Sequence, residues 1–461
     1  MKNKSLLYRV LRTGMVFLFL FALLCGSCAV YAEEGTASQG ADPSAVVSNA
    51  VANWPQISDT TSDYFCVMDA QTGAILCEKG MDVETPPASL TKIMTTLVAI
   101  ESGDLDAQVT MTETGVEYAV SGSSNLFTQV GEVFTLRDML YGTMLKSAND
   151  IATEVGEYVG GGSLDNFLSM MNERAAELGC TGTHFANACG MPHEEHHSTA
   201  HDLALISQEA LKNDLFREIV HTKQYTIPAT NLTDARTFEN HHKFLVTEEY
   251  AYDGIIGGKT GYTDLAGSCL ATYVERDGRT VICIALHCMG MDNCLQDTRK
   301  LCDYGLGEFR NVTVPDVQDK IISGGVVTIP KDGDIAECEV TSSTEVTEEG
   351  AERTTSVYTW HGREVGTVVT EKPPVTSTPE PTKVPEPVES EPQSVIPTKG
   401  AVTENAVRED AGASQTENVM SNEIVLPGIG SVTIVTLFLA LMLILILIIL
   451  LLIVIIIRRR R

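Results

Sequence analysis

An almost unbroken apolar run from Val432 to Ile457 divides the chain into parts with different environments. At 1.5 Å per residue the run gives about 39 Å of helix, against about 30 Å of bilayer hydrocarbon. It lacks the polar face that a helix on the surface of a globular domain needs. Arginines fill 458–461, and by the positive-inside rule they mark the cytoplasmic side. The sequence therefore predicts a transmembrane helix over 432–457 and a cytoplasmic basic tail over 458–461.

The N-terminal end predicts export. Basic residues precede an apolar run from Met15 to Leu24, and small residues continue to Ala32. This is the layout of a cleavable secretory signal, so we predict a signal peptide over 1–32. Cleavage before Cys28, of the lipoprotein type, is a weaker alternative. Signal and span together predict a single-pass protein of the cell membrane, with its catalytic part outside and its C-terminus in the cytoplasm.

Two further segments are predicted to lie outside any folded domain. Residues 372–430 are rich in Pro, Glu, Ser and Thr with almost no aromatic side chains, so they cannot bury enough apolar surface to fold. As a coil this linker spans about 40 Å, which lets the folded part work away from the membrane. We also expect residues 33–60 to be disordered.

The net charge excludes one class of partner. Lys and Arg number 32 against 61 Asp and Glu, which gives −29 at pH 7. Such a field repels phosphate backbones, so nucleic-acid binding is excluded. The hydrophobic content of 44% still supports a packed core, and the acidity therefore belongs to a solvated surface.

The periodicity of apolar residues predicts an α+β fold. The expected order is strands at 64–69 and 74–79, a helix from Leu90, a mostly helical region over 104–220, strands at 265–274 and 279–287, and a helix at 295–309. Strands at both ends of this region predict one antiparallel sheet with helices and an inserted helical subdomain, a catalytic domain over 61–310. Residues 311–371, rich in Val, Thr and Glu, predict a small all-β domain.

Cysteine placement leaves two interpretations open. Cys66 and Cys77 flank a predicted hairpin turn and could face each other as a disulfide; free buried thiols are equally compatible. Beyond the predicted signal peptide no Cys-x-x-Cys pair occurs, so a zinc ribbon is not indicated.

Ser89-x-x-Lys92 places a hydroxyl and an amine on one face at the start of a helix. A serine hydroxyl is a poor nucleophile until a base takes its proton, and a lysine desolvated in a pocket has the lowered pKa that suits this task. Alone the pattern is weak, because it occurs by chance about once in a chain of this length.

Two further motifs give the first one its meaning. Ser147-Ala148-Asn149 lies just beyond a predicted helix end, where a second hydroxyl can move protons and an amide can hold a carbonyl. Lys259-Thr260-Gly261 is placed just before the strand that begins at 265. There the lysine supplies positive charge, the threonine a hydroxyl donor, and the glycine leaves room for an extended substrate.

In this order the motifs resemble those of penicillin-binding proteins and β-lactamases, with Ala148 where their second motif has Asp. From Tyr64 to Phe309 the chain resembles the D-alanyl-D-alanine carboxypeptidases, low-molecular-mass penicillin-binding proteins of the S11 serine peptidase type. The segments that carry the resemblance include 87–95, 145–150, 171–190, 198–204 and 258–263. The resemblance implies a β-lactamase/transpeptidase-like catalytic domain.

The resemblance also implies catalytic roles. Ser89 is the nucleophile that becomes acylated, Lys92 is its general base, and Ser147 relays protons. The backbone N–H groups of Ser89 and Tyr262 form the oxyanion hole, where they meet charge that appears only in the tetrahedral state.

Substrate binding falls to a second set of residues by the same resemblance. Asn149 orients the peptide, Lys259 and Thr260 engage its terminal carboxylate, and Gly261 lets it lie along the strand. Some family members have an Arg in the stretch where this chain has His241. If His241 replaces that Arg by charge, carboxylate affinity falls above about pH 6.5, the reference pKa of histidine.

The implied reaction removes the terminal D-Ala from pentapeptide stems of peptidoglycan and so regulates cell-wall cross-linking. β-Lactams inhibit it by acylating Ser89, and the reaction requires neither a metal nor another cofactor. The expected partners are the stem peptides, β-lactams and, through the C-terminal helix, the membrane.

The sequence leaves four alternatives to this interpretation. A class A-like β-lactamase shares the motifs, but no Glu-x-x-Leu-Asn segment lies between the second and third of them. A catalytically silent wall-binding or penicillin-sensing protein would keep the same scaffold. His193, His196, His197 and His201 suggest a metal site, yet their order matches neither HExxH nor HxxEH. A cysteine nucleophile has no pattern in its favour.

Overall fold

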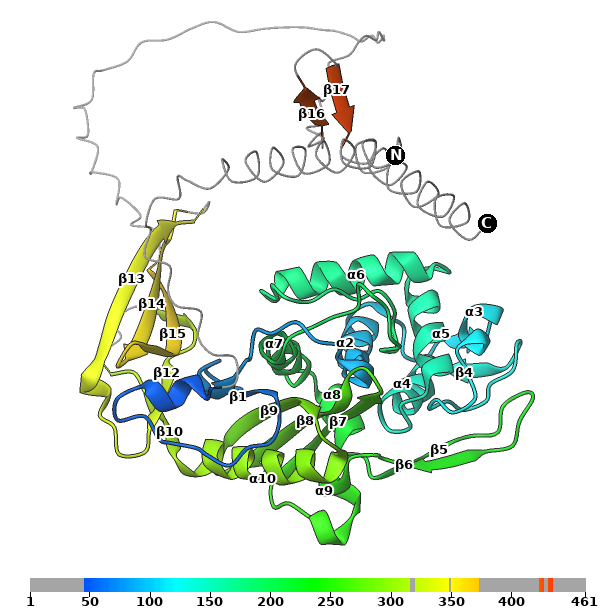
Figure 1. Cartoon of the computed structure of the whole chain (residues 1–461), viewed down its shortest axis with the longest axis horizontal. Helices are drawn as coiled ribbons and strands as arrows, with labels where there is room; N and C mark the ends of the chain where they lie inside the picture. The colour runs from blue at the N-terminus through cyan, green and yellow to red at the C-terminus, as the bar shows by residue number, and fades with distance from the viewer. Residues whose placement is uncertain (1–44, 316–319, 348–349, 373–422, 427–429, 434–461) are drawn as a thin grey trace, which may run out of the picture. The chain divides into compact units, whose positions relative to one another are not determined.

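The computed structural model of the chain describes residues 45–315, 320–347, 350–372, 423–426 and 430–433 (Figure 1). The predicted signal peptide, almost all of the linker and nearly the whole predicted membrane span lie outside these residues. No helix in the described part of the chain is long and apolar enough to cross a membrane. The chain divides into two units, up to Thr378 and from Pro379, and the described part of the second is the hairpin of β16 (Glu423–Leu426) and β17 (Gly430–Thr433).

A five-stranded antiparallel sheet is the centre of the first unit (Figure 1). Its order is β2-β1-β9-β8-β7, with β1 at Tyr64–Asp69, β2 at Ile75–Lys79, β7 at Ile255–Thr263, β8 at Gly267–Arg276 and β9 at Arg279–Cys288. The prediction of one sheet built from both ends of the domain is therefore confirmed. It leaves β7 at one edge of the sheet.

Helices cover both faces of this sheet because its strands are apolar on both sides. On β1, Cys66 and Met68 belong to a core shared with the inserted helices, whereas Phe65 and Val67 belong to a core shared with α10. This alternation is the period of two that a strand imposes. The helices are α2 (Lys92–Ser102), α3 (Glu113–Glu117), α4 (Leu136–Met144), α5 (Asn149–Val159), α6 (Leu164–Glu177), α7 (Ala200–Ala210), α8 (Asp214–His221), α9 (Lys243–Val246) and α10 (Met291–Gly307).

Two small hairpins extend the helical part. They pair β3 (Gln108–Thr110) with β4 (Val133–Thr135), and β5 (Gln224–Ile227) with β6 (Arg236–Glu239). Short 3-10 helices, η1 to η4, lie at Val47–Ala50, Ala88–Thr91, Glu248–Tyr250 and Ile335–Glu337. The second of these carries Ser89 and runs directly into α2, so the predicted position of Ser89 at a helix start is confirmed.

A second, smaller group of strands follows α10. β10 (Phe309–Thr313) pairs with β12 (Val326–Pro330), and a four-stranded sheet has the order β11-β15-β14-β13, from Lys320–Ser323, Arg363–Lys372, Glu352–Trp360 and Cys338–Val346. Arg363 joins this sheet to the first one, because its guanidinium donates to both carboxylate oxygens of Glu78 at 2.7 and 2.6 Å. It also lies 4.8 Å above the ring of Trp54.

The expectation of disorder over 33–60 is wrong for residues 45–60. Trp54 is only 2% exposed, and its ring lies 5.1 Å from Phe309 and 5.7 Å from Trp360. Its indole N–H donates to Leu76 O at 2.7 Å. An indole that packs in this way and finds a hydrogen-bond partner can order the segment around it.

The cross-strand disulfide is also wrong. Cys66 lies opposite Glu78 and Cys77 opposite Val67, so the two thiols point to opposite faces of the sheet. All ten cysteines of the described residues are free thiols, and most of them are buried.

Candidate active site

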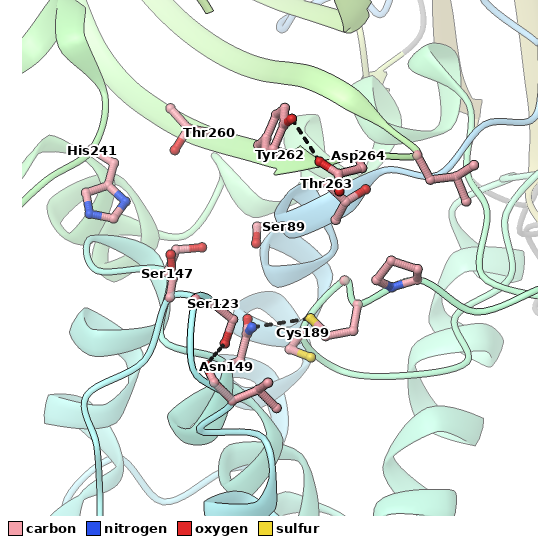
Figure 2. A pocket seen from close by; sticks show the side chains of 18 of the residues that line it. Ser89, Ser123, Ser147, Asn149, Cys189, His241, Thr260, Tyr262, Thr263 and Asp264 are labelled. Atoms are coloured by element: carbon pink, nitrogen blue, oxygen red, sulfur yellow. Dashed lines mark hydrogen bonds between the residues drawn. The ribbon is translucent and has the colours of Figure 1, made fainter.

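The three sequence motifs meet at one cleft. A cavity of about 660 Å³ is bounded by the start of α2, the loop before α5, the loop after residue 187 and strand β7. Figure 2 shows the side chains that point into it, and the predicted site residues among its lining are Ser89, Ser147, Asn149, His241, Thr260, Gly261 and Tyr262. Lys92 and Lys259 are buried beneath this surface and hydrogen-bond to it.

Lys92 is held against the Ser89 hydroxyl by fixed acceptors. Its Nζ donates to Ser89 Oγ at 3.0 Å, to Asn149 Oδ1 at 2.7 Å and to Cys189 O at 2.5 Å. Burial lowers the pKa of Lys92 to about 8, against the opposing influence of Cys189 and Asp150. A neutral amine is therefore accessible near physiological pH, within hydrogen-bond distance of the proton it would take.

A second lysine and hydroxyl pair lies across the cleft. Lys259 Nζ donates to Ser147 Oγ at 2.9 Å and to Thr260 O at 2.7 Å. Burial, and after it the positive charge of Lys92, lowers the pKa of Lys259 well below its usual value. Ser147 has a φ of +59°, which directs the chain sharply between α4 and α5 and turns its hydroxyl toward the cleft (Figure 2).

Lys259-Thr260-Gly261 lies within β7, not before the strand, so the predicted placement is wrong. The strand runs from Ile255 to Thr263, and β8 begins only at Gly267. Glycines at three positions hide the apolar alternation by which a strand is recognised. The position within β7 favours the predicted role of the motif in binding an extended substrate, because β7 is an edge strand whose backbone can pair with a peptide.

Gly261 brings β7 close to the nucleophile. A Cβ at this position would lie 3.1 Å from Ser89 N and 3.1 Å from the Cβ of Ala88. Any side chain there would press on the turn that carries Ser89. Tyr262 follows Gly261 on β7 and lines the same cleft as Ser89, so the two residues predicted to form the oxyanion hole lie near each other.

His241 lines the cleft but is not a cation at neutral pH. Desolvation between the cleft walls, then the positive charges of Lys259, Lys146 and Lys92, lower the pKa of His241 to about 4. The loss of carboxylate affinity above pH 6.5 was expected only if His241 acts by charge, and this lowered pKa does not favour that role. His241 can still serve as a neutral N–H donor.

Asn187 was missed by sequence reasoning. Its Oδ1 accepts from three successive backbone N–H groups, those of Cys189 at 3.2 Å, Gly190 at 2.7 Å and Met191 at 3.1 Å. This turn presents Cys189 O to Lys92. Asn-x-x-Gly is a recognisable turn signal, but its meaning depends on a contact 97 residues away.

The histidines of the cluster have separate hydrogen-bond and ion-pair partners. His201 Nδ1 lies 3.1 Å from Asp82 Oδ1, His197 Nε2 lies 3.9 Å from Glu84 Oε2, and His196 bonds into the core. Among the residues that the structure describes, no three His, Cys, Asp or Glu side chains converge as metal ligands.

The sheet with its helices and the serine and lysine pairs define a serine enzyme of the penicillin-binding class. The family model for D-alanyl-D-alanine carboxypeptidase, peptidase S11, matches residues 49–290, and the chain belongs to this family.

Individual relatives agree with this assignment. A D-alanyl-D-alanine carboxypeptidase of Streptomyces sp. (strain K15) is 34% identical over 250 residues, which are 52% of this chain and 84% of the relative. DacF of Bacillus subtilis, another D-alanyl-D-alanine carboxypeptidase, is 30% identical over 55% of this chain and 66% of its own length. The solved Streptomyces K15 DD-transpeptidase is 32% identical with a TM-score of 0.51, over 55% of this chain and 99% of that one.

Proposed function

We propose that this protein is a serine-type D-Ala-D-Ala carboxypeptidase, which removes the terminal D-Ala from peptidoglycan stem peptides through an acyl-enzyme on Ser89. The observation that carries the proposal is the buried Lys92 amine, 3.0 Å from Ser89 Oγ and with its pKa lowered to about 8. A lysine so placed can act as the base that a serine nucleophile needs.

Acylation follows from this geometry. Neutral Lys92 takes the proton of Ser89 as Oγ attacks the carbonyl carbon of the scissile peptide. The N–H groups of Ser89 and Tyr262 donate to the developing oxyanion. The departing D-Ala nitrogen needs a proton when the C–N bond breaks. Ser147, hydrogen-bonded to Lys259 at 2.9 Å, can deliver its hydroxyl proton, and the proton that Lys92 took from Ser89 then replaces it, so that both groups end acylation neutral.

Deacylation reverses the proton flow. Water attacks the ester carbonyl, neutral Lys92 accepts a proton of that water, and it passes this proton to Ser89 Oγ when the ester bond breaks. A β-lactam acylates the same hydroxyl. Its opened ring keeps the leaving nitrogen tethered, which accounts for slow turnover and inhibition.

The substrate carboxylate is recognised at the Lys259 end of the cleft. Thr260 and neutral His241 line this end of the cleft (Figure 2). Lys259 is buried and its Nζ donates to Thr260 O. Asn149 holds the peptide, since its Oδ1 is bonded to Lys92 and its Nδ2 contacts only the weak acceptor Met191 Sδ at 3.5 Å among its described partners. Binding an anion beside Lys259 would favour its charged form.

We also propose that the enzyme acts outside the cytoplasm, attached by a helix over 432–457 and separated from the membrane by the linker over 372–430. This rests on the signal-like N-terminus, the apolar run and the arginines that follow it. Protease protection of the C-terminal tail in membrane vesicles tests the orientation.

The experiment for the activity measures D-Ala release from diacetyl-Lys-D-Ala-D-Ala by the full-length protein beside Ser89→Ala and Lys92→Ala. Release that disappears in both variants supports the proposal. Release that persists in Ser89→Ala refutes it. Labelling by fluorescent penicillin without D-Ala release indicates a silent penicillin-binding protein, and rapid turnover of benzylpenicillin indicates a β-lactamase.

A further inference from the structure

Ala88, the residue before the nucleophile, has a backbone conformation that needs support. Its φ is +48°, in the left-handed region that residues with a Cβ rarely adopt. The carbonyl of Ala88 and the N–H of Ser89 belong to one planar trans peptide, so they point in opposite directions. Whatever fixes the Ala88 carbonyl therefore also fixes the direction of the Ser89 N–H.

A chain of hydrogen bonds from the histidine cluster reaches this carbonyl. Ala186 N–H donates to Nδ1 of His196 at 3.1 Å, which makes Nδ1 an acceptor and leaves the hydrogen of the neutral ring on Nε2. Nε2–H donates to Thr91 Oγ1 at 2.8 Å. The hydrogen of the Thr91 hydroxyl is then directed to Ala88 O, also at 2.8 Å.

The surroundings keep this chain dry and neutral. Thr91 is fully buried and His196 is 3% exposed. Burial, followed by the neighbouring His193, His197 and His184, lowers the pKa of His196 to about 3. The imidazole is therefore neutral near physiological pH, and the Ala186 N–H that donates to Nδ1 selects its tautomer.

Two glycines enclose the same peptide. A Cβ on Gly190 would lie 1.9 Å from Ala88 O, so that carbonyl sits directly against the Gly190 backbone. On the cleft side, a Cβ on Gly261 would lie 3.1 Å from Ser89 N. The carbonyl thus points into the protein and the N–H toward β7.

From this arrangement we infer that His196 and Thr91 are positioning residues, which hold the Ala88–Ser89 peptide so that the Ser89 N–H points at the oxyanion. The inference rests on the proposed function, because an oxyanion forms only if Ser89 is acylated. His196 is the one buried histidine of the cluster, and this inference gives it a role in acylation.

Matched variants test the inference in the full-length protein. Thr91→Val keeps the shape of the side chain and removes the hydroxyl, and Thr91→Ser keeps the hydroxyl. His196→Leu removes the donor, and His193→Gln changes an exposed imidazole in the same loop as a control. The readouts are the acylation rate constant with fluorescent penicillin, the final labelling stoichiometry, and kcat and KM for the tripeptide.

Thr91→Val and His196→Leu should slow acylation about 10- to 100-fold, the effect expected of a misdirected catalytic group. They should still label fully and show a lowered kcat with little change in KM. Thr91→Ser and His193→Gln should stay within about threefold of wild type. The inference is overturned if Thr91→Val is acylated at the wild-type rate, or if Thr91→Ser is acylated as slowly as Thr91→Val. It is also overturned if the variants lose only labelling stoichiometry, in parallel with a fall in melting temperature.

A structural readout separates this inference from the proposed function. If wild type neither labels nor releases D-Ala, the proposed function fails, and crystal structures of wild type and Thr91→Val decide the role of the hydrogen-bond chain. A rotated Ala88–Ser89 peptide in the variant supports that role, and an unchanged peptide refutes it.

Discussion

Raising the pH should activate this enzyme, because Lys92 must lose its proton before Ser89 can lose its own. Burial disfavours the charged amine and lowers the pKa of Lys92 to about 8. A base with that pKa is about 1% neutral at pH 6, about half neutral at pH 8 and about 90% neutral at pH 9. The second-order rate constant of acylation should therefore rise about 90-fold from pH 6 to pH 9 and then level off.

The assay is stopped-flow acylation by a β-lactam that has no titrating group between pH 5.5 and 10. His241→Gln is the matched control, since His241, with its pKa lowered to about 4, is already neutral throughout this range. Wild type and control should show the same pH dependence, whatever the difference in their absolute rates, because His241 faces the carboxylate end of the cleft. If the rate constant still climbs tenfold per pH unit at pH 10, the pKa of Lys92 is not lowered and the reasoning is refuted. If the rate constant instead changes near pH 6.5 and His241→Gln removes that change, the titrating group is the histidine.

Other substitutions have equally definite outcomes. Gly190→Ala should reduce penicillin acylation at least about 100-fold, since its Cβ would lie 1.9 Å from a backbone oxygen in the nucleophile turn; a wild-type rate contradicts this. Arg363→Met leaves the buried Glu78 carboxylate without its bidentate partner and should destabilise the fold by about 3–5 kcal/mol in chemical denaturation, with the acylation rate retained. Ser147→Ala should slow D-Ala release about 100-fold, while mass spectrometry still finds the penicilloyl group on Ser89; label elsewhere would reverse the assignment.

From the sequence, the catalytic residues of the site were predicted better than the backbone and contacts that support them. Ser89, Lys92 and Ser147 were found because three motifs in a fixed order resemble those of penicillin-binding proteins, whereas Ser-x-x-Lys alone was a weak signal. Their convergence with the segment at Lys259 is confirmed by hydrogen bonds across the cleft. Strand β7 was misplaced because its glycines, which permit close approach to the nucleophile, erase the apolar alternation of a strand.

Features that depend on contacts between residues far apart in the chain could not be predicted from the sequence. Trp54 orders a segment expected to be disordered, because residues more than 200 positions away form the pocket for its ring. In the sequence His196 cannot be distinguished from the other clustered histidines. Its contacts with Thr91 and Ala186 in the structure distinguish it. The neutrality of His241 depends on burial and on three lysines from other parts of the chain. Sequence spacing cannot report such desolvation.

The cleft holds two pairs of serine and lysine, and the backbone decides which serine attacks. Each hydroxyl accepts from a buried amine at nearly the same distance, 3.0 Å for Ser89 and 2.9 Å for Ser147. Only Ser89 has its own N–H beside Gly261 on the edge strand, where a peptide carbonyl bound along β7 would place its oxygen. Ser147, bonded to Lys259 instead, is left to pass a proton to the leaving group. The asymmetry of the reaction thus arises from the strand and the nucleophile turn, since the two side-chain pairs alone are nearly equivalent.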